Sequence, residues 1–206
     1  MKTAFIVAFT LSVALAGCGS ATESADEPDA TASSPTPVTT ASASTDEPSQ
    51  VQTEPMVALD GEGLRIVMPS GSTRLLAFGS ERAEIERIMG QISGVAPSRS
   101  ENGECGAGPM QMTVYDNFTL NFQDGAFVGW YADGEGGWST MDGLGTGSTR
   151  KGVEATRTTS LVEGSTLGTE FATGDGGEGT IGGFFEDESA DAMVTGLYAG
   201  TNCFFR

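Results

Sequence analysis

The stretch GSERAEIE, residues 79–86, returns as GSTRKGVE at residues 147–154, with Gly, Ser, Arg and Glu in the same four places. A second match follows in the same order, because FVGWYA at 127–132 corresponds to VTGLYA at 194–199. The two offsets are 68 and 67 residues, so the spacing is nearly conserved. This favours an internal duplication over coincidence in a chain with 30 glycines, and the unit is too long for a solenoid repeat.

Each copy predicts a helix beside short strands. In the first copy Ser80 is expected to cap a helix whose apolar face includes Ile85 and Met89; in the second, Ser148 is expected to cap a shorter one. Alternating apolar runs separated by turn residues predict strands near residues 64–68, 74–78, 110–115, 118–122, 126–132, 168–172, 180–185 and 193–198. The predicted fold class is α+β, with two tandem half-domains, about 63–132 and 137–206, each a short helix packed on an antiparallel sheet.

The first 17 residues have the layout of an export signal. A single lysine precedes a mostly apolar run from Ala4 to Ala16, which is too short to span a bilayer. Leu15-Ala16-Gly17-Cys18 resembles the lipobox of bacterial lipoproteins, which implies that Cys18 is acylated, with a diacylglycerol and a further chain such as palmitate. Gly19 and Ser20 favour the outer membrane, with the protein facing the periplasm. The alternative is an ordinary signal peptide cut after Ala16.

Residues 18–54 predict a lipidated cysteine followed by a disordered tether rich in Ser, Thr, Ala and Pro. The segment after Cys18 has seven acidic residues, no basic or aromatic residue and only two large aliphatic ones. Such a composition buries too little apolar surface to offset the entropy of ordering. Residues 55–206 are then the folded domain, of a normal size for one core.

The folded domain is strongly acidic, and the chain lacks histidine. From residue 56 on, 21 acidic against 9 basic residues give a net charge of −12. Such a surface repels phosphate backbones, which argues against a nucleic-acid partner. The lack of histidine removes the usual Ser-His and Cys-His catalytic pairs and most zinc sites. We therefore predict no catalytic residue, no metal and no cofactor.

Two cysteines remain once Cys18 is assigned to lipid. In an exported chain an isolated pair such as Cys105 and Cys203 predicts a disulfide bond. Two free thiols or a metal-binding pair are the alternatives.

The helix-opening pattern carries a resemblance to a known family. Gly79, Ser80, Ile85, Met89 and Gly90 resemble the signature of small bacterial envelope lipoproteins typified by the barrel-assembly accessory lipoprotein. A tandem duplication of such a unit resembles the β-lactamase inhibitor protein. The resemblance implies two halves that each lay helices against an antiparallel sheet.

Acidic glycine-containing segments are the remaining candidates for metal chemistry. DGEG at 60–63, DGEGG at 133–137 and GDGGEG at 174–179 are interpreted as turns, with a weak Ca²⁺ site as the alternative. EDESAD at 186–191 is interpreted as a solvated hairpin loop instead of a catalytic carboxylate pair.

Aromatic residues in the matched strands are the candidate binding residues. Trp130 and Tyr131 are adjacent, so one side chain points to the core and the other to the opposite face of the sheet. Tyr198 matches Tyr131 in the second copy. We predict that Trp130, Tyr131 and Tyr198 contribute to a binding surface; alternatively, the other half of the domain covers this face.

The function expected from these features is a lipid-anchored envelope module that binds or scaffolds a protein partner without catalysis. It would contact the membrane through its lipid and would not bind nucleic acid. The alternatives are an envelope hydrolase that uses carboxylates, with possible Ca²⁺, and a solute-binding lipoprotein.

Overall fold

The structure is a computed structural model that describes residues 53–134 and 137–205. The predicted signal peptide, Cys18 and all but the last two residues of the predicted tether lie outside the described residues. No helix in the described part of the chain is long and apolar enough to cross a membrane.

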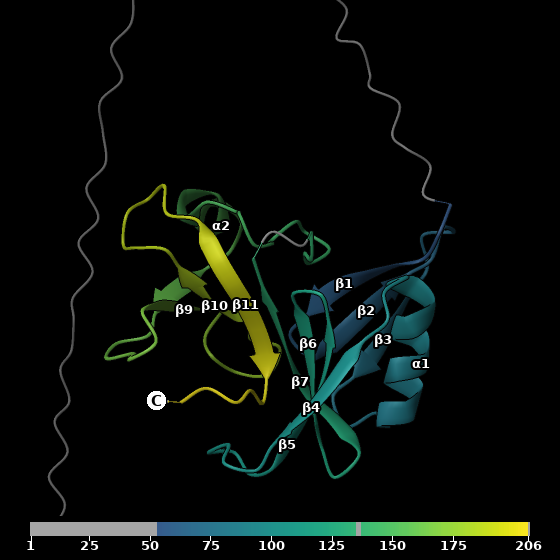
Figure 1. Cartoon of the computed structure of the whole chain (residues 1–206). Coiled ribbons are helices and arrows are strands. Elements are labelled where there is room, and N and C mark those ends of the chain that lie inside the picture. The colour runs from purple at the N-terminus through teal and green to yellow at the C-terminus, as the bar shows by residue number, and fades with distance from the viewer. Residues whose placement is uncertain (1–52, 135–136, 206) are drawn as a thin grey trace, which may run out of the picture. The chain divides into compact units, whose positions relative to one another are not determined.

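The largest element is an antiparallel sheet of eight strands, in the order β4-β5-β6-β7-β11-β10-β9-β8 (Figure 1). Its strands are β4 (Ser98–Asn102), β5 (Met110–Tyr115), β6 (Phe118–Gln123), β7 (Ala126–Asp133), β8 (Thr159–Leu161), β9 (Thr169–Thr173), β10 (Gly182–Phe185) and β11 (Val194–Gly200). The strand order is symmetric about its centre, where β7 pairs with β11.

A smaller antiparallel sheet and two helices complete the described domain. The small sheet has the order β1-β2-β3, with β1 at Met56–Asp60, β2 at Gly63–Val67 and β3 at Thr73–Ala77. Helix α1 (Arg82–Ile92) follows β3, and helix α2 (Arg150–Thr156) follows the long connection after β7. In Figure 1, α1 lies beside β3, and α2 lies near one end of β11.

The prediction of two half-domains, each a helix on its own sheet, is wrong. A helix followed by four strands does occur twice along the chain, but β7 and β11 pair and join all eight strands into one sheet. Helix α2 has only 7 residues, too few to cover a sheet of its own. The fold is therefore mostly β, built from an eight-stranded and a three-stranded sheet.

All eight predicted strands overlap observed ones, and in β6 the reason is an apolar alternation with period two. Phe118, Leu120 and Phe122 in β6 are fully buried, and Trp130 in β7 is paired with Leu120 and so points to the same side. Ile85 of α1 belongs to the same hydrophobic core. Trp130 Nε1 donates a hydrogen bond of 2.9 Å to the carbonyl of Asp60, which attaches the small sheet to the large one.

Three strands were not predicted, namely β1, β4 and β8. Strand β4 is SRSEN, with four of its five residues exposed, and β8 has only three residues. Both are edge strands, where polar residues are tolerated because only one side of the strand is paired and little is buried.

Both predicted helix caps are also wrong. The N-cap of α1 is Glu81, without a side-chain cap hydrogen bond. The N-cap of α2 is Thr149, whose side chain accepts from the Gly152 N–H. Ser148 Oγ accepts instead from the Gly145 N–H. The backbone of Ser80 pairs with β7, where the Ser80 carbonyl accepts from the Phe127 N–H.

Candidate functional site

Four aromatic side chains form a cluster beside the central strand pair, which we call the aromatic cluster: Tyr131, Phe184, Tyr198 and Phe204. Strand pairing places Tyr131 directly opposite Tyr198, and Gly182 of β10 opposite Tyr198. Since side chains alternate between faces, both tyrosines point away from buried Trp130 and Leu197. All four cluster members are half-buried.

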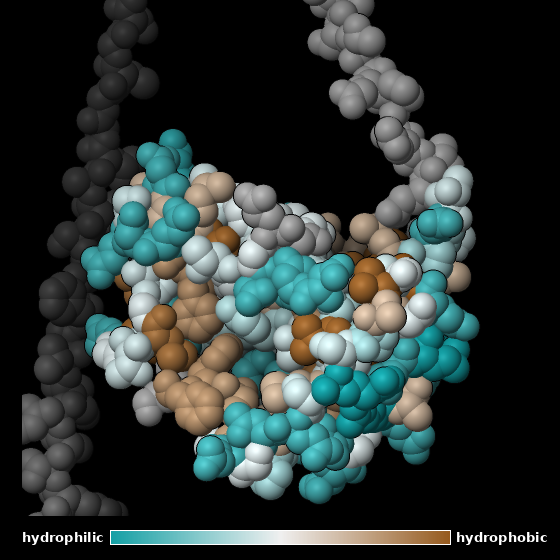
Figure 2. All heavy atoms as spheres, viewed as in Figure 1, coloured by the Kyte–Doolittle hydropathy of each residue, from teal (hydrophilic) through white to brown (hydrophobic). Residues whose placement is uncertain are grey.

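Phe204 completes the cluster from the segment that follows β11. Its ring centroid lies 5.0 Å from that of Tyr198, 5.6 Å from Phe184 and 5.7 Å from Tyr131. Each of these contacts is edge-on, an arrangement that aromatic pairs favour. Figure 2 shows apolar residues gathered over β11 and the C-terminal segment, with hydrophilic residues around them.

Two glycines allow the tyrosine rings to lie close to the sheet. A Cβ atom at Gly182 would lie 2.2 Å from Tyr198 Cζ, and one at Gly196 would lie 2.9 Å from the Tyr131 hydroxyl. Any larger residue at either position would displace a ring. The glycines of β10 and β11 therefore shape the floor of the aromatic cluster.

A buried carboxylate holds the orientation of Tyr198. The Tyr198 hydroxyl donates to Glu170 Oε1 at 2.5 Å, and Ser165 Oγ donates to Glu170 Oε2 at 2.6 Å. Glu170 is only 2% exposed, and hydrogen bonds offset part of the cost of burying a carboxylate. Burial, with a smaller effect of the Asp133 charge, raises the pKa of Tyr131.

The segment that carries Phe204 is attached at several points. Thr201 N–H donates to Val128 O at 2.7 Å, and Asn121 Nδ2 donates to Asn202 Oδ1 at 2.7 Å. These bonds fold the end of the chain back onto the sheet. Phe205, the next residue, is 69% exposed.

The predicted disulfide is absent from the structure, which has Cys105 and Cys203 as free thiols. Cys105 nevertheless lies close enough to affect the Cys203 thiol, and Asn102 Nδ2 donates to Cys203 Sγ at 3.4 Å. Burial, together with the neighbouring Cys105, raises the pKa of Cys203 to about 11. The fold therefore brings together two cysteines that are 98 positions apart (203 − 105).

Of the three predicted binding residues, the structure places two in the aromatic cluster. Trp130 is fully buried and so cannot contact a partner. Phe184 and Phe204 were not predicted. Phe184 lies in a short run, GGFF, whose alternation is hidden by two glycines, and the position of Phe204 depends on the fold-back of the chain end.

The acidic segments take the structure of turns and loops where they are described. DGEG at 60–63 forms the β1–β2 turn, and GDGGEG at 174–179 joins β9 to β10; residues 135–136 of the third turn lie outside the described residues. EDESAD at 186–191 joins β10 to β11. Within residues 53–134 and 137–205, no group of three or more His, Cys, Asp or Glu side chains could hold a metal ion.

Comparison of the chain with protein families, with curated proteins and with solved structures finds no match.

Proposed function

We propose that this protein is a lipid-anchored lipoprotein of the cell envelope that binds or scaffolds a protein partner and catalyses no reaction. The observation that supports this is the half-exposed aromatic cluster beside β7 and β11. Aromatic side chains contribute large contact areas with few rotatable bonds, and they dominate the binding energy of many protein interfaces. The rings are held in place by one another and by Glu170, which lowers the entropy lost on binding.

The anchor in this proposal is an acylated Cys18, followed by the acidic tether, in the outer membrane facing the periplasm. Several acyl chains hold a protein on a membrane where a single chain binds only marginally. The Cys18→Ala variant is therefore expected to lose all label from a fatty-acid analogue supplied to cells. Label that persists in the variant would contradict the anchor.

The binding role is tested with the full chain in envelope membranes, by capture and quantitative mass spectrometry. Tyr131→Ala and Phe184→Ala each remove one ring of the aromatic cluster, so they are expected to deplete the captured partner at least tenfold, a loss typical of interface hot spots. Met141→Ala is the matched control, because Met141 is 58% exposed and lies outside the cluster. A partner retained equally by all three variants would rule out the aromatic cluster as the binding surface.

A further inference from the structure

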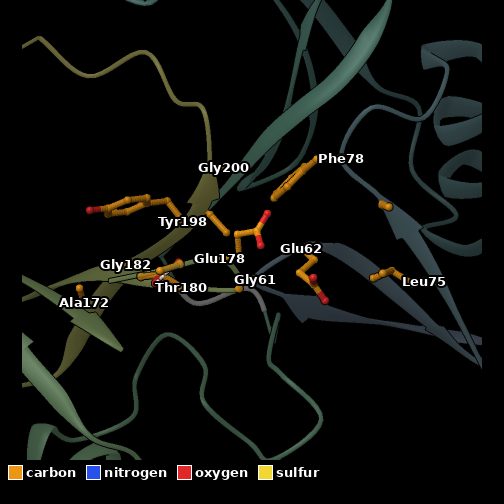
Figure 3. A pocket seen from close by; sticks show the side chains of 14 residues that line it. Gly61, Glu62, Leu75, Phe78, Ala172, Glu178, Thr180, Gly182, Tyr198 and Gly200 are labelled. Carbon is orange, nitrogen blue, oxygen red and sulfur yellow. Dashed lines mark hydrogen bonds between the residues drawn. The ribbon is translucent and has the colours of Figure 1, made fainter. Parts of the chain in front are cut away.

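A pocket of about 520 Å³ lies next to the aromatic cluster. Its sides come from β3, from the β1–β2 turn, from the loop between β9 and β10, and from the ends of β10 and β11 (Figure 3). Tyr198 belongs both to the pocket lining and to the aromatic cluster. The pocket is thus continuous with the proposed binding surface.

Two sides of the pocket contact each other through their backbones. A Cβ atom at Gly61, in the β1–β2 turn, would lie 1.9 Å from the carbonyl oxygen of Gly179 in the β9–β10 loop. The turn and the loop therefore touch backbone to backbone. Leu75 and Phe78, both half-buried, supply apolar lining from the side of β3.

The charges that line the pocket are all negative. Glu62 and Glu178 line it, and both are exposed. Among the described residues neither carboxylate has an ion-pair or hydrogen-bond partner, and the lining contains no Lys or Arg. Asp60, in the same turn as Glu62, is by contrast neutralised by Arg65 at 2.7 Å. Figure 3 shows Glu178 projecting between Tyr198 and Phe78, with Glu62 on the side of Phe78.

This lining matches a cation carried on an apolar stem. The methylene groups of a lysine or arginine side chain would pack on Leu75 and Phe78, since such stems bury well while the charged head stays polar. The head would reach Glu62 and Glu178 through charge-assisted hydrogen bonds. The ring of Phe78 adds a cation–π contact, whereas an anionic ligand would be repelled.

We propose that the pocket receives a lysine or arginine side chain of the protein that binds the aromatic cluster. This inference rests on the proposed function and adds the chemistry of the partner: a basic side chain beside an apolar patch. The net charge of −12 on the folded domain attracts such a partner from a distance, which speeds association at low salt.

The test is an NMR titration of the purified full chain with a blocked arginine, N-acetyl-arginine amide, as the probe. The neutral isostere N-acetyl-citrulline amide is the matched ligand. We expect saturable shifts of signals from the pocket with the arginine probe, weakened at high salt, and at least tenfold weaker binding of the citrulline probe. Equal binding of the two probes, or no binding of the arginine probe, would overturn the proposal.

The double variant Glu62→Gln/Glu178→Gln is expected to weaken binding of the arginine probe at least tenfold. The variant Glu163→Gln/Glu188→Gln, with two exposed glutamates outside the pocket, is the control and should bind like the wild type. Tighter binding of free spermidine than of the arginine probe would reassign the pocket to soluble polyamines and overturn the proposal. None of these measurements needs the partner, so they stay valid if the membrane capture fails. If the probe does not bind the pocket, the proposal that the aromatic cluster binds a protein is not contradicted.

Discussion

Tyr131 and Tyr198 occupy matching positions in the two repeated stretches and lie directly opposite each other in the β7–β11 pair. On either side of them, Trp130 pairs with Ala199 and Ala132 pairs with Leu197. An antiparallel pair in which matching residues face each other has a local two-fold axis at that point. The two matching stretches therefore meet at the centre of the eight-stranded sheet, and the aromatic cluster lies beside this centre.

The glycine beneath Tyr198 provides the first prediction. Gly182→Ala introduces a Cβ that overlaps the Tyr198 ring, so we expect a loss of about 1 to 3 kcal/mol in the free energy of unfolding, as for other overpacked sites. Gly90→Ala in α1 is the control, because its Cβ would meet no atom within 4 Å; it should stabilise by about 0.5 to 1 kcal/mol. Urea denaturation measures both, and equal effects would disprove the close packing of the ring.

Matching helix positions differ in how much they bury. Ile85 in α1 is fully buried and Val153 in α2 is 3% exposed. Ile85→Ala should cost about 2 to 5 kcal/mol in the free energy of unfolding because it leaves a cavity. Val153→Ala removes fewer atoms and should cost less. A larger loss for Val153→Ala in chemical denaturation would contradict this ranking.

The glutamates at matching helix positions also differ. Glu86 accepts hydrogen bonds from Arg82, Arg99 and Thr113, whereas the hydrogen bond found for the Glu154 side chain comes from Arg150, at 2.7 Å. Glu86→Gln is expected to cost about 1.5 to 3 kcal/mol, since several charge-assisted bonds weaken together.

Glu154→Gln is the matched control. It removes an i,i+4 pair in which the glutamate is 42% exposed, so we expect a loss of about 0.2 to 0.5 kcal/mol. Calorimetric melting of both variants gives the comparison. A loss for Glu154→Gln as large as that for Glu86→Gln would mean that the Glu86 network contributes little.

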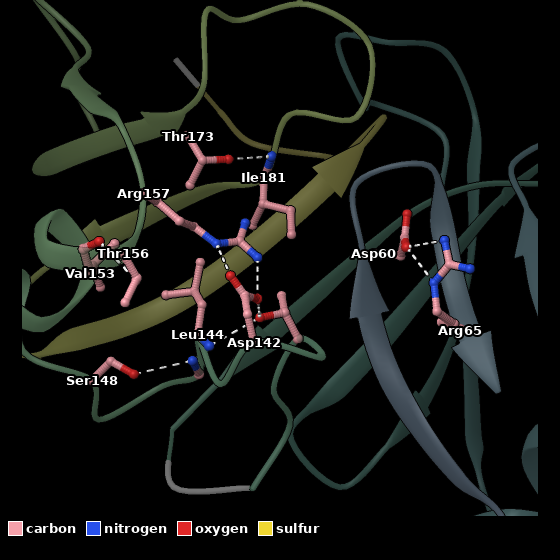
Figure 4. Close-up of polar contacts among 12 residues, drawn as sticks. Asp60, Arg65, Asp142, Leu144, Ser148, Val153, Thr156, Arg157, Thr173 and Ile181 are labelled. Atoms are coloured by element: carbon pink, nitrogen blue, oxygen red, sulfur yellow. Dashed lines mark hydrogen bonds and ion pairs between the residues drawn. The ribbon is translucent and has the colours of Figure 1, made fainter. Parts of the chain in front are cut away.

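Acid is expected to destabilise the protein through the same network and through Asp142. Arg99 is the main cause that lowers the pKa of Glu86 from 4.5 to about 2, and Arg157 lowers that of Asp142 from 3.8 to about 2. Figure 4 shows Arg157 facing Asp142, where its Nε donates at 2.8 Å.

Because both pKa values are lower in the folded state, the stability that they contribute is complete above about pH 4.5 and is lost as the pH falls towards 2. The urea midpoint should therefore decrease over this range. The Glu86→Gln variant should show a shallower decrease, because one of the two groups no longer titrates. An equally steep decrease in the variant would assign the acid sensitivity to other carboxylates.

The contact between Cys105 and Cys203 predicts that an oxidant joins them. With oxidised glutathione, the first thiolate forms a mixed disulfide with one glutathione and releases the other as a thiol. The second thiolate then attacks this mixed disulfide and releases the remaining glutathione as a thiol. In total the protein loses two protons and two electrons. The high pKa of Cys203 makes its thiolate scarce at neutral pH, so the reaction should accelerate with rising pH. Mass spectrometry after alkylation should find no free thiol in the described domain.

In the chain-entropy model a disulfide that closes this loop stabilises by roughly 4 to 5 kcal/mol. The oxidised protein should therefore melt at a higher temperature than the reduced one. Cys203→Ser is the control and should show no difference between oxidising and reducing conditions. Two alkylated cysteines after prolonged oxidation would show that the sulfur atoms cannot meet.

The sequence by itself determined where the buried strands other than β1 lie, because a period-two alternation such as Phe118, Leu120 and Phe122 reports burial of one face directly. It also determined the two helices, and it showed that one residue of the Trp130–Tyr131 pair enters the core. Only the tertiary structure decided that the two copies share one sheet, since the pairing of β7 with β11 joins residues far apart in the chain. The same long-range pairing decided that Phe184 and Phe204 meet the tyrosines and that Glu62 and Glu178 line one pocket, because local patterns carry no information about which distant backbones come into contact.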